Sequence, residues 1–202
     1  MKKVHDVELY HNDWVSLRKV VSPDNGVKGY VYSTETRCNG EIISIMPYRR
    51  VMVVAEAMKD LRLGKDLGRV EWRYLMKSEA TPCWALAAKT KLLHQFLSTL
   101  TGGVEDGDST NTACNELEEE AGYKVTLDML VDLGTCFASK SSDTIYHLYS
   151  VDLTGFPQEE PVGDGSALEK AAKPIWVKKE QILESPDPLA SVLFLRLQQH
   201  LL

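Results

Sequence analysis

The sequence has few cysteines, no long apolar run and no excess of positive charge. Its four cysteines are scattered over 202 residues: Cys38, Cys83, Cys114 and Cys136. This spacing is not that of a zinc site. We expect the four thiols to stay reduced, as in the cytoplasm. No apolar stretch approaches the roughly 20 residues of a membrane span, and the first residues lack the apolar core of a signal peptide. We therefore expect a cytoplasmic protein without a membrane partner.

The balance of charge is acidic, with 29 Asp and Glu against 23 Lys and Arg and a formal net charge of −6. The sequence has no basic stripe of the kind that binds nucleic acid, so we expect no nucleic-acid partner. The length and the 44% hydrophobic content are those of one domain, or of one domain with a small appendage. A phosphorylated ligand would therefore need a metal ion or a few local basic side chains.

The most informative segment is an acidic helix that ends at a glycine. At 100° per residue, Glu116, Glu119 and Glu120 lie within an arc of about 100° on one helix face. The helix dipole disfavours negative charge at this carboxyl end by about 0.3–1 kcal/mol per group, and repulsion at the i, i+4 spacing adds about 0.2–0.5 kcal/mol. No Lys or Arg lies between Gly102 and Tyr123 to offset this charge. The cluster therefore predicts an external cation, and its oxygen ligands favour Mg²⁺ or Mn²⁺.

The two ends of this helix carry their own signals. Asp108 or Ser109 is the expected N-cap, and Gly122 is expected to end the helix in a left-handed conformation. The apolar stripe of the helix consists of Ala113, Leu117 and Ala121. Ahead of the helix, the Gly102-Gly103 pair lets the backbone approach another segment or a ligand closely.

A glycine pair, a short acidic turn and a helix ending in Glu-Glu-x-Gly resemble the box of the Nudix hydrolase family. That box reads Gly-x5-Glu-x7-Arg-Glu-U-x-Glu-Glu-x-Gly-U, where U is aliphatic or aromatic, and its second half matches residues 116–123. The resemblance implies an α/β/α sandwich with a mixed β-sheet between helices. It also implies metal-dependent hydrolysis of a nucleoside diphosphate linked to another group.

By the same resemblance, Glu116, Glu119 and Glu120 are catalytic residues that hold the metal, and the carbonyl of Gly102 is a further ligand. Two features depart from the family's pattern. Asn115 stands where the family has an arginine that usually orients and pairs with a box carboxylate. The first half of the box is also two residues short, so its first glutamate corresponds to one of two residues: Asp108 or Glu105.

The first 40 residues form a predicted strand extension, and residues 41–202 form the predicted hydrolase domain. Residues 7–21 and 28–34 have the β-branched and aromatic content of strands, and a strong turn at 23–26 separates them. Their position resembles that of the extra N-terminal strands of the ADP-sugar branch of the Nudix family. The resemblance implies a homodimer formed through these strands, while a plain extension of the sheet is the alternative.

The rest of the chain alternates strands and turns. Apolar content and alternation predict further strands over 41–50, 51–55, 70–79, 125–137, 144–151 and 174–177. Residues 85–97 are helix or loop, and residues 155–170 form a long acidic loop. Residues 178–184 begin a helix, and Asp187-Pro188 begins a final amphipathic one.

Several residues outside the helix are candidates for the site. In the ADP-sugar branch a carboxylate on a late loop often serves as general base; Glu169 occupies that region here, and the other acids of the loop compete with it: Glu159, Glu160 and Asp164. Arg49 and Arg73 are candidates to bind phosphate, and Trp84 is a candidate to stack on a base or sugar. Each of these residues also has a plain structural interpretation, as surface charge or as core.

Three functions remain open from the sequence. The first is a Mg²⁺-dependent pyrophosphatase of ADP-ribose or a nucleotide sugar, which the length and the N-terminal strands favour. The second is a module that senses a nucleotide without turnover, which Asn115 favours. The third is an interaction scaffold that uses its acidic face for docking.

Overall fold

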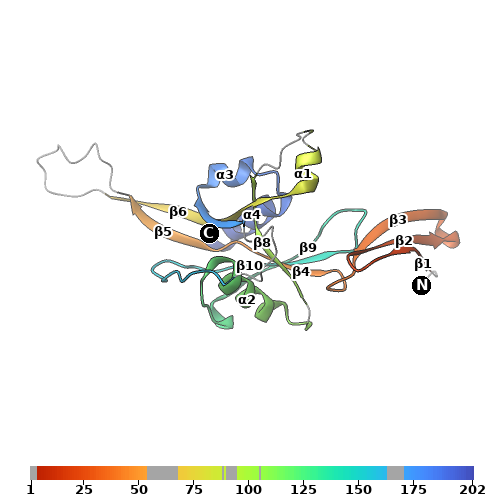
Figure 1. Ribbon diagram of the computed structural model, residues 1–202, viewed down its shortest axis with the longest axis horizontal. Helices are drawn as coiled ribbons and strands as arrows, with labels where there is room; N and C mark the ends of the chain where they lie inside the picture. The colour runs from red at the N-terminus through yellow and green to blue at the C-terminus, as the bar shows by residue number, and fades with distance from the viewer. Residues whose placement is uncertain (1–3, 54–67, 88, 90–94, 105, 163–170) are drawn as a thin grey trace, which may run out of the picture.

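The computed structural model describes residues 4–53, 68–87, 89, 95–104, 106–162 and 171–202. Within these ranges, two four-stranded sheets and four α-helices form the body of the molecule, and a separate three-stranded sheet projects from one end (Figure 1). No helix in these ranges is both long and apolar enough to cross a membrane.

The first sheet of the body is mixed, with the strand order β8-β4-β10-β9. Its strands are β4 (Glu41–Ile45), β8 (Leu100–Gly103), β9 (Val131–Phe137) and β10 (Ile145–Ser150). Strand β10 runs parallel to β4, with His147 opposite Ile43, whereas β4–β8 and β10–β9 are antiparallel. The first sheet therefore brings the Gly102-Gly103 pair, at the end of β8, beside the central strand β4.

The second sheet of the body is antiparallel, with the order β11-β6-β5 and with β7 also paired to β6. Its strands are β5 (Tyr48–Val53), β6 (Arg69–Ala80), β7 (Gln95–Ser98) and β11 (Lys173–Val177). Backbone hydrogen bonds join the two sheets where β4 passes into β5, from Met46 N–H to the Tyr149 carbonyl at 3.0 Å and from Tyr48 N–H to the Val151 carbonyl at 2.9 Å.

Helices cover both sides of the sheets, and the hydrophobic core is divided accordingly. The helices are α1 (Pro82–Ala87), α2 (Ser109–Ala121), α3 (Lys179–Glu184) and α4 (Pro188–Leu201). The apolar stripe of α2 packs on β4 residues such as Ile43 and Ile45, while α4 packs through Leu193 and Leu197 on Leu148 of β10. Figure 1 shows α2 on one side of β4 and β10, with α3 and α4 on the other. The predicted α/β/α sandwich with a mixed sheet is confirmed.

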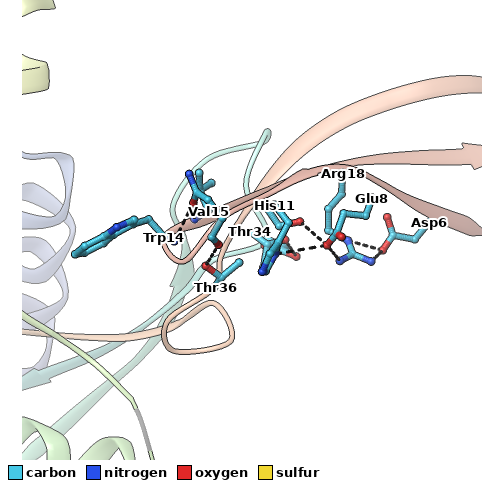
Figure 2. A network of polar contacts seen from close by, with 11 residues as sticks. Asp6, Glu8, His11, Trp14, Val15, Arg18, Thr34 and Thr36 are labelled. Atoms are coloured by element: carbon cyan, nitrogen blue, oxygen red, sulfur yellow. Dashed lines mark hydrogen bonds and ion pairs between the residues drawn. The ribbon is translucent and has the colours of Figure 1, made fainter.

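The N-terminal strands form their own antiparallel sheet, in the order β1-β2-β3. They are β1 (His5–His11), β2 (Val15–Ser22) and β3 (Val27–Glu35), with a 3₁₀ turn at Pro23–Asn25 where the sequence predicted a turn. Arg18 of β2 donates to Asp6 at 2.7 Å and lies 3.5 Å from Glu8, so charges pair across β1 and β2 (Figure 2). Thr34 donates to Asp143 at 2.8 Å, which ties this sheet to the loop between β9 and β10.

Two segments differ from the sequence prediction. Residues 85–97 were expected to be helix or loop, but residues 95–97 belong to strand β7. The strand expected from residue 125 begins at Val131, because a 3₁₀ turn at Leu127–Met129 precedes it. In the first case the pairing of β7 with β6 decides the structure, and in the second a local turn does.

Candidate active site

Asp108, the first of the two expected N-caps, caps the start of helix α2. The Asp108 carboxylate accepts hydrogen bonds from the N–H groups of Thr110 and Asn111, both at 3.0 Å. The bond from the Asn111 backbone is the main reason that the pKa of Asp108 lies below its ordinary value. The predicted apolar stripe is also confirmed, because Ala113, Leu117 and Ala121 are fully buried.

The helix ends at Gly122, in the predicted left-handed conformation, with φ at 71°. Its N–H donates to the Glu118 carbonyl at 3.0 Å, and its carbonyl accepts the N–H of Glu159 at 2.8 Å. The backbone of Glu159 lies so close that a Cβ at Gly122 would overlap its carbonyl oxygen and come within 2.8 Å of its carbonyl carbon. The loop at 155–162 is therefore seated on the carboxyl end of the acidic helix, where only glycine fits.

Gly102 and Glu116 are in contact where strand β8 packs against helix α2. A Cβ on Gly102 would overlap the carboxyl group of Glu116, so the side chain lies directly on the glycine backbone. The Gly102 position is fixed by its pairing with Ile43 of β4. The structure thus brings together two of the predicted metal-site residues, although they are 14 positions apart in the chain.

Glu120 is paired with a cation that the sequence analysis did not identify. Lys77 of β6 forms an ion pair and hydrogen bond with the Glu120 carboxylate, and its Nζ lies 3.3 Å from Glu79. Burial lowers the pKa of Lys77, but the attraction of Glu120 and Glu79 outweighs it, and the net pKa lies above the ordinary value of 10.5. The sequence predicted an external cation for the acidic cluster, whereas the structure places Lys77, from another element of the same chain, on Glu120.

The remaining residues of the acidic arc lie nearer to solvent. Glu119 is exposed, and so is Asn115, the residue in place of the family's arginine. Within the described ranges, no three His, Cys, Asp or Glu side chains are gathered closely enough to hold a metal ion. The three glutamates therefore have the right donor chemistry for Mg²⁺, but their present arrangement, with Lys77 on Glu120, does not fit a preformed site.

Basic side chains lie on the same face of the second sheet as Lys77. Arg49 of β5 lies opposite Arg73 of β6, and residues 73, 75 and 77 share a face by strand alternation. The guanidinium of Arg49 stacks on Trp176 of β11, with its carbon 4.1 Å from the ring centroid. Arg73 pairs with Glu71 at 2.6 Å, and this hydrogen bond holds the pKa of Glu71 below its ordinary value.

Arg49 and Trp176 each present a donor that has no partner among the described residues. Arg49 Nε and Trp176 Nε1 are buried, and the described residues offer neither of them a hydrogen-bond acceptor. Tyr123, just after the acidic helix, packs edge-on against Trp176 at 6.2 Å between ring centroids. Trp176 thereby links Arg49 to the end of α2, which sequence reasoning missed because a lone tryptophan in a short strand is typical of core.

The predicted residue Trp84 has its ring contact in another part of the fold. Trp84, in α1, packs edge-on against Phe96 of β7, with ring centroids 5.7 Å apart. The predicted general base, Glu169, lies outside the described residues, as does Asp164. Of the competing loop acids, Glu159 pairs with Lys124 at 3.0 Å.

No protein-family model and no curated protein matches the sequence. Among solved structures, an ADP compounds hydrolase has a TM-score of 0.64 at 13% identity, over 99% of this chain and 94% of its own. A protein assigned as a Nudix hydrolase from Listeria monocytogenes has a TM-score of 0.40 at 15% identity, over 79% of this chain and 94% of its own. A Nudix hydrolase from Nitrosomonas europaea has a TM-score of 0.46 at 15% identity, over 79% and 88%. With the sandwich described above, the first likeness confirms the fold that the resemblance implied: the chain has the Nudix α/β/α fold.

Proposed function

We propose that this chain hydrolyses the phosphoric anhydride bond of a nucleoside diphosphate linked to another group, such as ADP-ribose or a nucleotide sugar. The observation that carries the proposal is the contact between the Glu116 carboxylate, on the acidic face of α2, and the Gly102 backbone. The likeness in fold to an ADP compounds hydrolase, over 99% of this chain, supports the same class of substrate.

The proposed cofactor is Mg²⁺ or Mn²⁺, with Glu116, Glu119, Glu120 and the Gly102 carbonyl as its ligands. When bound, such an ion neutralises charge on phosphate oxygens and lowers the pKa of a bound water. Glu116 and Glu120 lie one helical turn apart, so their side chains project from the same face of α2. The ion must compete with Lys77 for Glu120.

The proposed substrate contacts are made by Arg49 and Arg73 with the phosphates and by Trp84 with a base or sugar. Arg49 supports this role best, because its Nε is buried and lacks an acceptor among the described residues. Stacking on Trp176 holds its guanidinium plane in place. Arg73 would exchange the Glu71 carboxylate for a phosphate oxygen, which is also negatively charged. Glu169 remains the proposed general base.

The decisive experiment is a hydrolysis screen of ADP-ribose, nucleotide sugars, dinucleoside polyphosphates and nucleoside triphosphates, with and without Mg²⁺. We expect turnover of a diphosphate-linked substrate only with the metal. Glu116→Gln should reduce it by about 100-fold or more, since changes even in the outer shell of a metal cost about 10–100-fold. Glu118→Gln is the matched control, because Glu118 pairs with Lys124 outside the acidic arc. Equal activity in both variants would overturn the assignment.

The competing function is a nucleotide-sensing module with little or no turnover. The neutral, exposed Asn115 and the Lys77–Glu120 pair favour it, because both reduce the readiness of the helix for a metal. Calorimetric titration with ADP-ribose separates the two functions. Binding without hydrolysis, in the presence of Mg²⁺ or Mn²⁺, would establish the sensor.

We also propose that the chain is a homodimer formed through the N-terminal sheet, in the cytoplasm. The apolar side chains exposed on this sheet support the interface: Val7, Leu9, Tyr10, Trp14, Leu17, Tyr30 and Val31. The four cysteines form no disulfide in the structure, in keeping with a reducing compartment. Light scattering after gel filtration should give a mass of two chains, and Leu9→Glu, Leu17→Glu should give one.

A further inference from the structure

The Lys77 side chain lies buried against the acidic helix, and it reaches there from another layer of the fold. The residue lies in the last third of β6 and is 7% exposed. Its ammonium group contacts Glu120 of α2 and Glu79 of its own strand. Helix α2 itself has no basic side chain in its last turn. Lys77 is therefore a cation held in the part of the molecule where the helix needs one.

A buried ammonium group must keep a carboxylate partner, because an isolated buried charge is costly. Lys77 has two such partners, Glu120 on the helix and Glu79 on the sheet. Glu79 is fixed independently of Lys77, since the Ser98 hydroxyl donates to its other oxygen at 2.6 Å. Ser98 is itself buried on β7, opposite Lys77. The ammonium group can thus leave Glu120 and remain paired with Glu79.

We propose that Lys77 is a resident cation that competes with a divalent metal ion for Glu120. In the metal-free protein its ammonium group bridges Glu120 and Glu79. When the ion binds, Lys77 withdraws to Glu79, and Glu120 becomes a metal ligand. The inference rests on the metal site of the proposed function. It explains why the described glutamates are not already arranged as a metal site.

Mn²⁺ titration of the purified chain, without substrate, tests the competition. Lys77→Gln should bind Mn²⁺ about tenfold more tightly than the parent, the lower end of the range for outer-shell changes. A lysine that merely orients Glu120 for the metal gives the opposite sign, a loss of affinity. Lys124→Gln is the matched control, because it removes a positive charge from exposed pairs with Glu118 and Glu159. An unchanged or weaker affinity in Lys77→Gln overturns the proposal.

Glu79→Gln tests the second partner. It removes the position to which Lys77 withdraws, so Mn²⁺ affinity should fall by about tenfold, opposite to the effect at Lys77. Equal shifts of the same sign in the two variants would contradict the exchange between Glu120 and Glu79.

A measurement on the unaltered chain covers the case in which Lys77→Gln does not fold. Lys77 should react slowly with an amine-acylating reagent, and Mg²⁺ should change its rate at least twofold while that of Lys124 stays constant. If saturating Mg²⁺ leaves the acylation rate of Lys77 unchanged, the proposal is overturned. So does a parent chain that binds neither ion. Metal exchange without any substrate turnover would instead refute only the proposed hydrolysis.

Discussion

Replacing Gly122 by alanine should destabilise the protein through two separable effects. The first is backbone strain, because φ is 71° and an L-residue in the left-handed region costs about 1–2 kcal/mol. The second is a clash, because the new methyl group would overlap the carbonyl oxygen of Glu159 and lie 3.3 Å from the nitrogen of Pro161. Those are backbone atoms, which cannot rotate away, so overpacking adds about 1–3 kcal/mol. The expected total is about 2–5 kcal/mol.

Gly107 is the matched control for this prediction. Its φ of 74° is nearly the same, but nothing lies within 4 Å of a Cβ placed there. Gly107→Ala should therefore cost only the strain, about 1–2 kcal/mol. Urea denaturation of the parent and both variants measures the difference. Limited proteolysis should also cut residues 155–162 faster in Gly122→Ala alone, because the clash displaces this loop. If both variants lose the same stability, the contact between Glu159 and the helix end does not hold in solution.

The remaining predictions concern pH and catalysis. Hydrogen bonding lowers the pKa of Asp108 below 3.8, so its carboxylate stabilises the fold above that pH and loses this effect as the pH falls through the lowered pKa. Urea denaturation between pH 6 and pH 3 should therefore show a smaller loss of stability for Asp108→Asn than for the parent chain. Asn115→Arg should keep or raise the rate of hydrolysis, since position 115 is exposed and accommodates a longer side chain; a tenfold fall in kcat would refute this. Glu169→Gln should lower kcat by about 10²–10⁴ with little change in KM, as expected for loss of a general base; unchanged kcat would exclude that role.

The acidic helix was predictable because its determinants are local. The Asp108 cap, the spacing of the apolar stripe and the left-handed Gly122 all act within about one or two turns. The mixed sheet followed from the resemblance of this short segment to a known family. The resemblance also placed Glu116 and Gly102 in one site, but their direct contact is a finding of the structure.

The cation on Glu120 could not be predicted in the same way. Lys77 precedes Glu120 by 43 positions, and its strand reads simply as an alternating one. Only the pairing of β6 with β7 and β11 fixes which face of the strand meets the helix. The same reasoning applies to β7, a four-residue strand whose identity depends on the neighbour it joins. Non-local pairing, rather than propensity, set the limit of the sequence analysis.

The Lys77–Glu120 pair is a poor device for stability alone. Desolvation of two buried charges cancels most of their attraction, and well-packed apolar residues of similar volume commonly serve a fold as well or better. Loss of one partner, by contrast, costs about 3–5 kcal/mol because the other charge remains buried. Lys77 thus adds little net stability while making the chain dependent on a charge in this place. That charge lies on the carboxylate of a helix whose dipole and neighbouring glutamates already call for a cation. A site that alternates between an internal ammonium and an external metal accounts for both properties, because neither state leaves Glu120 uncompensated.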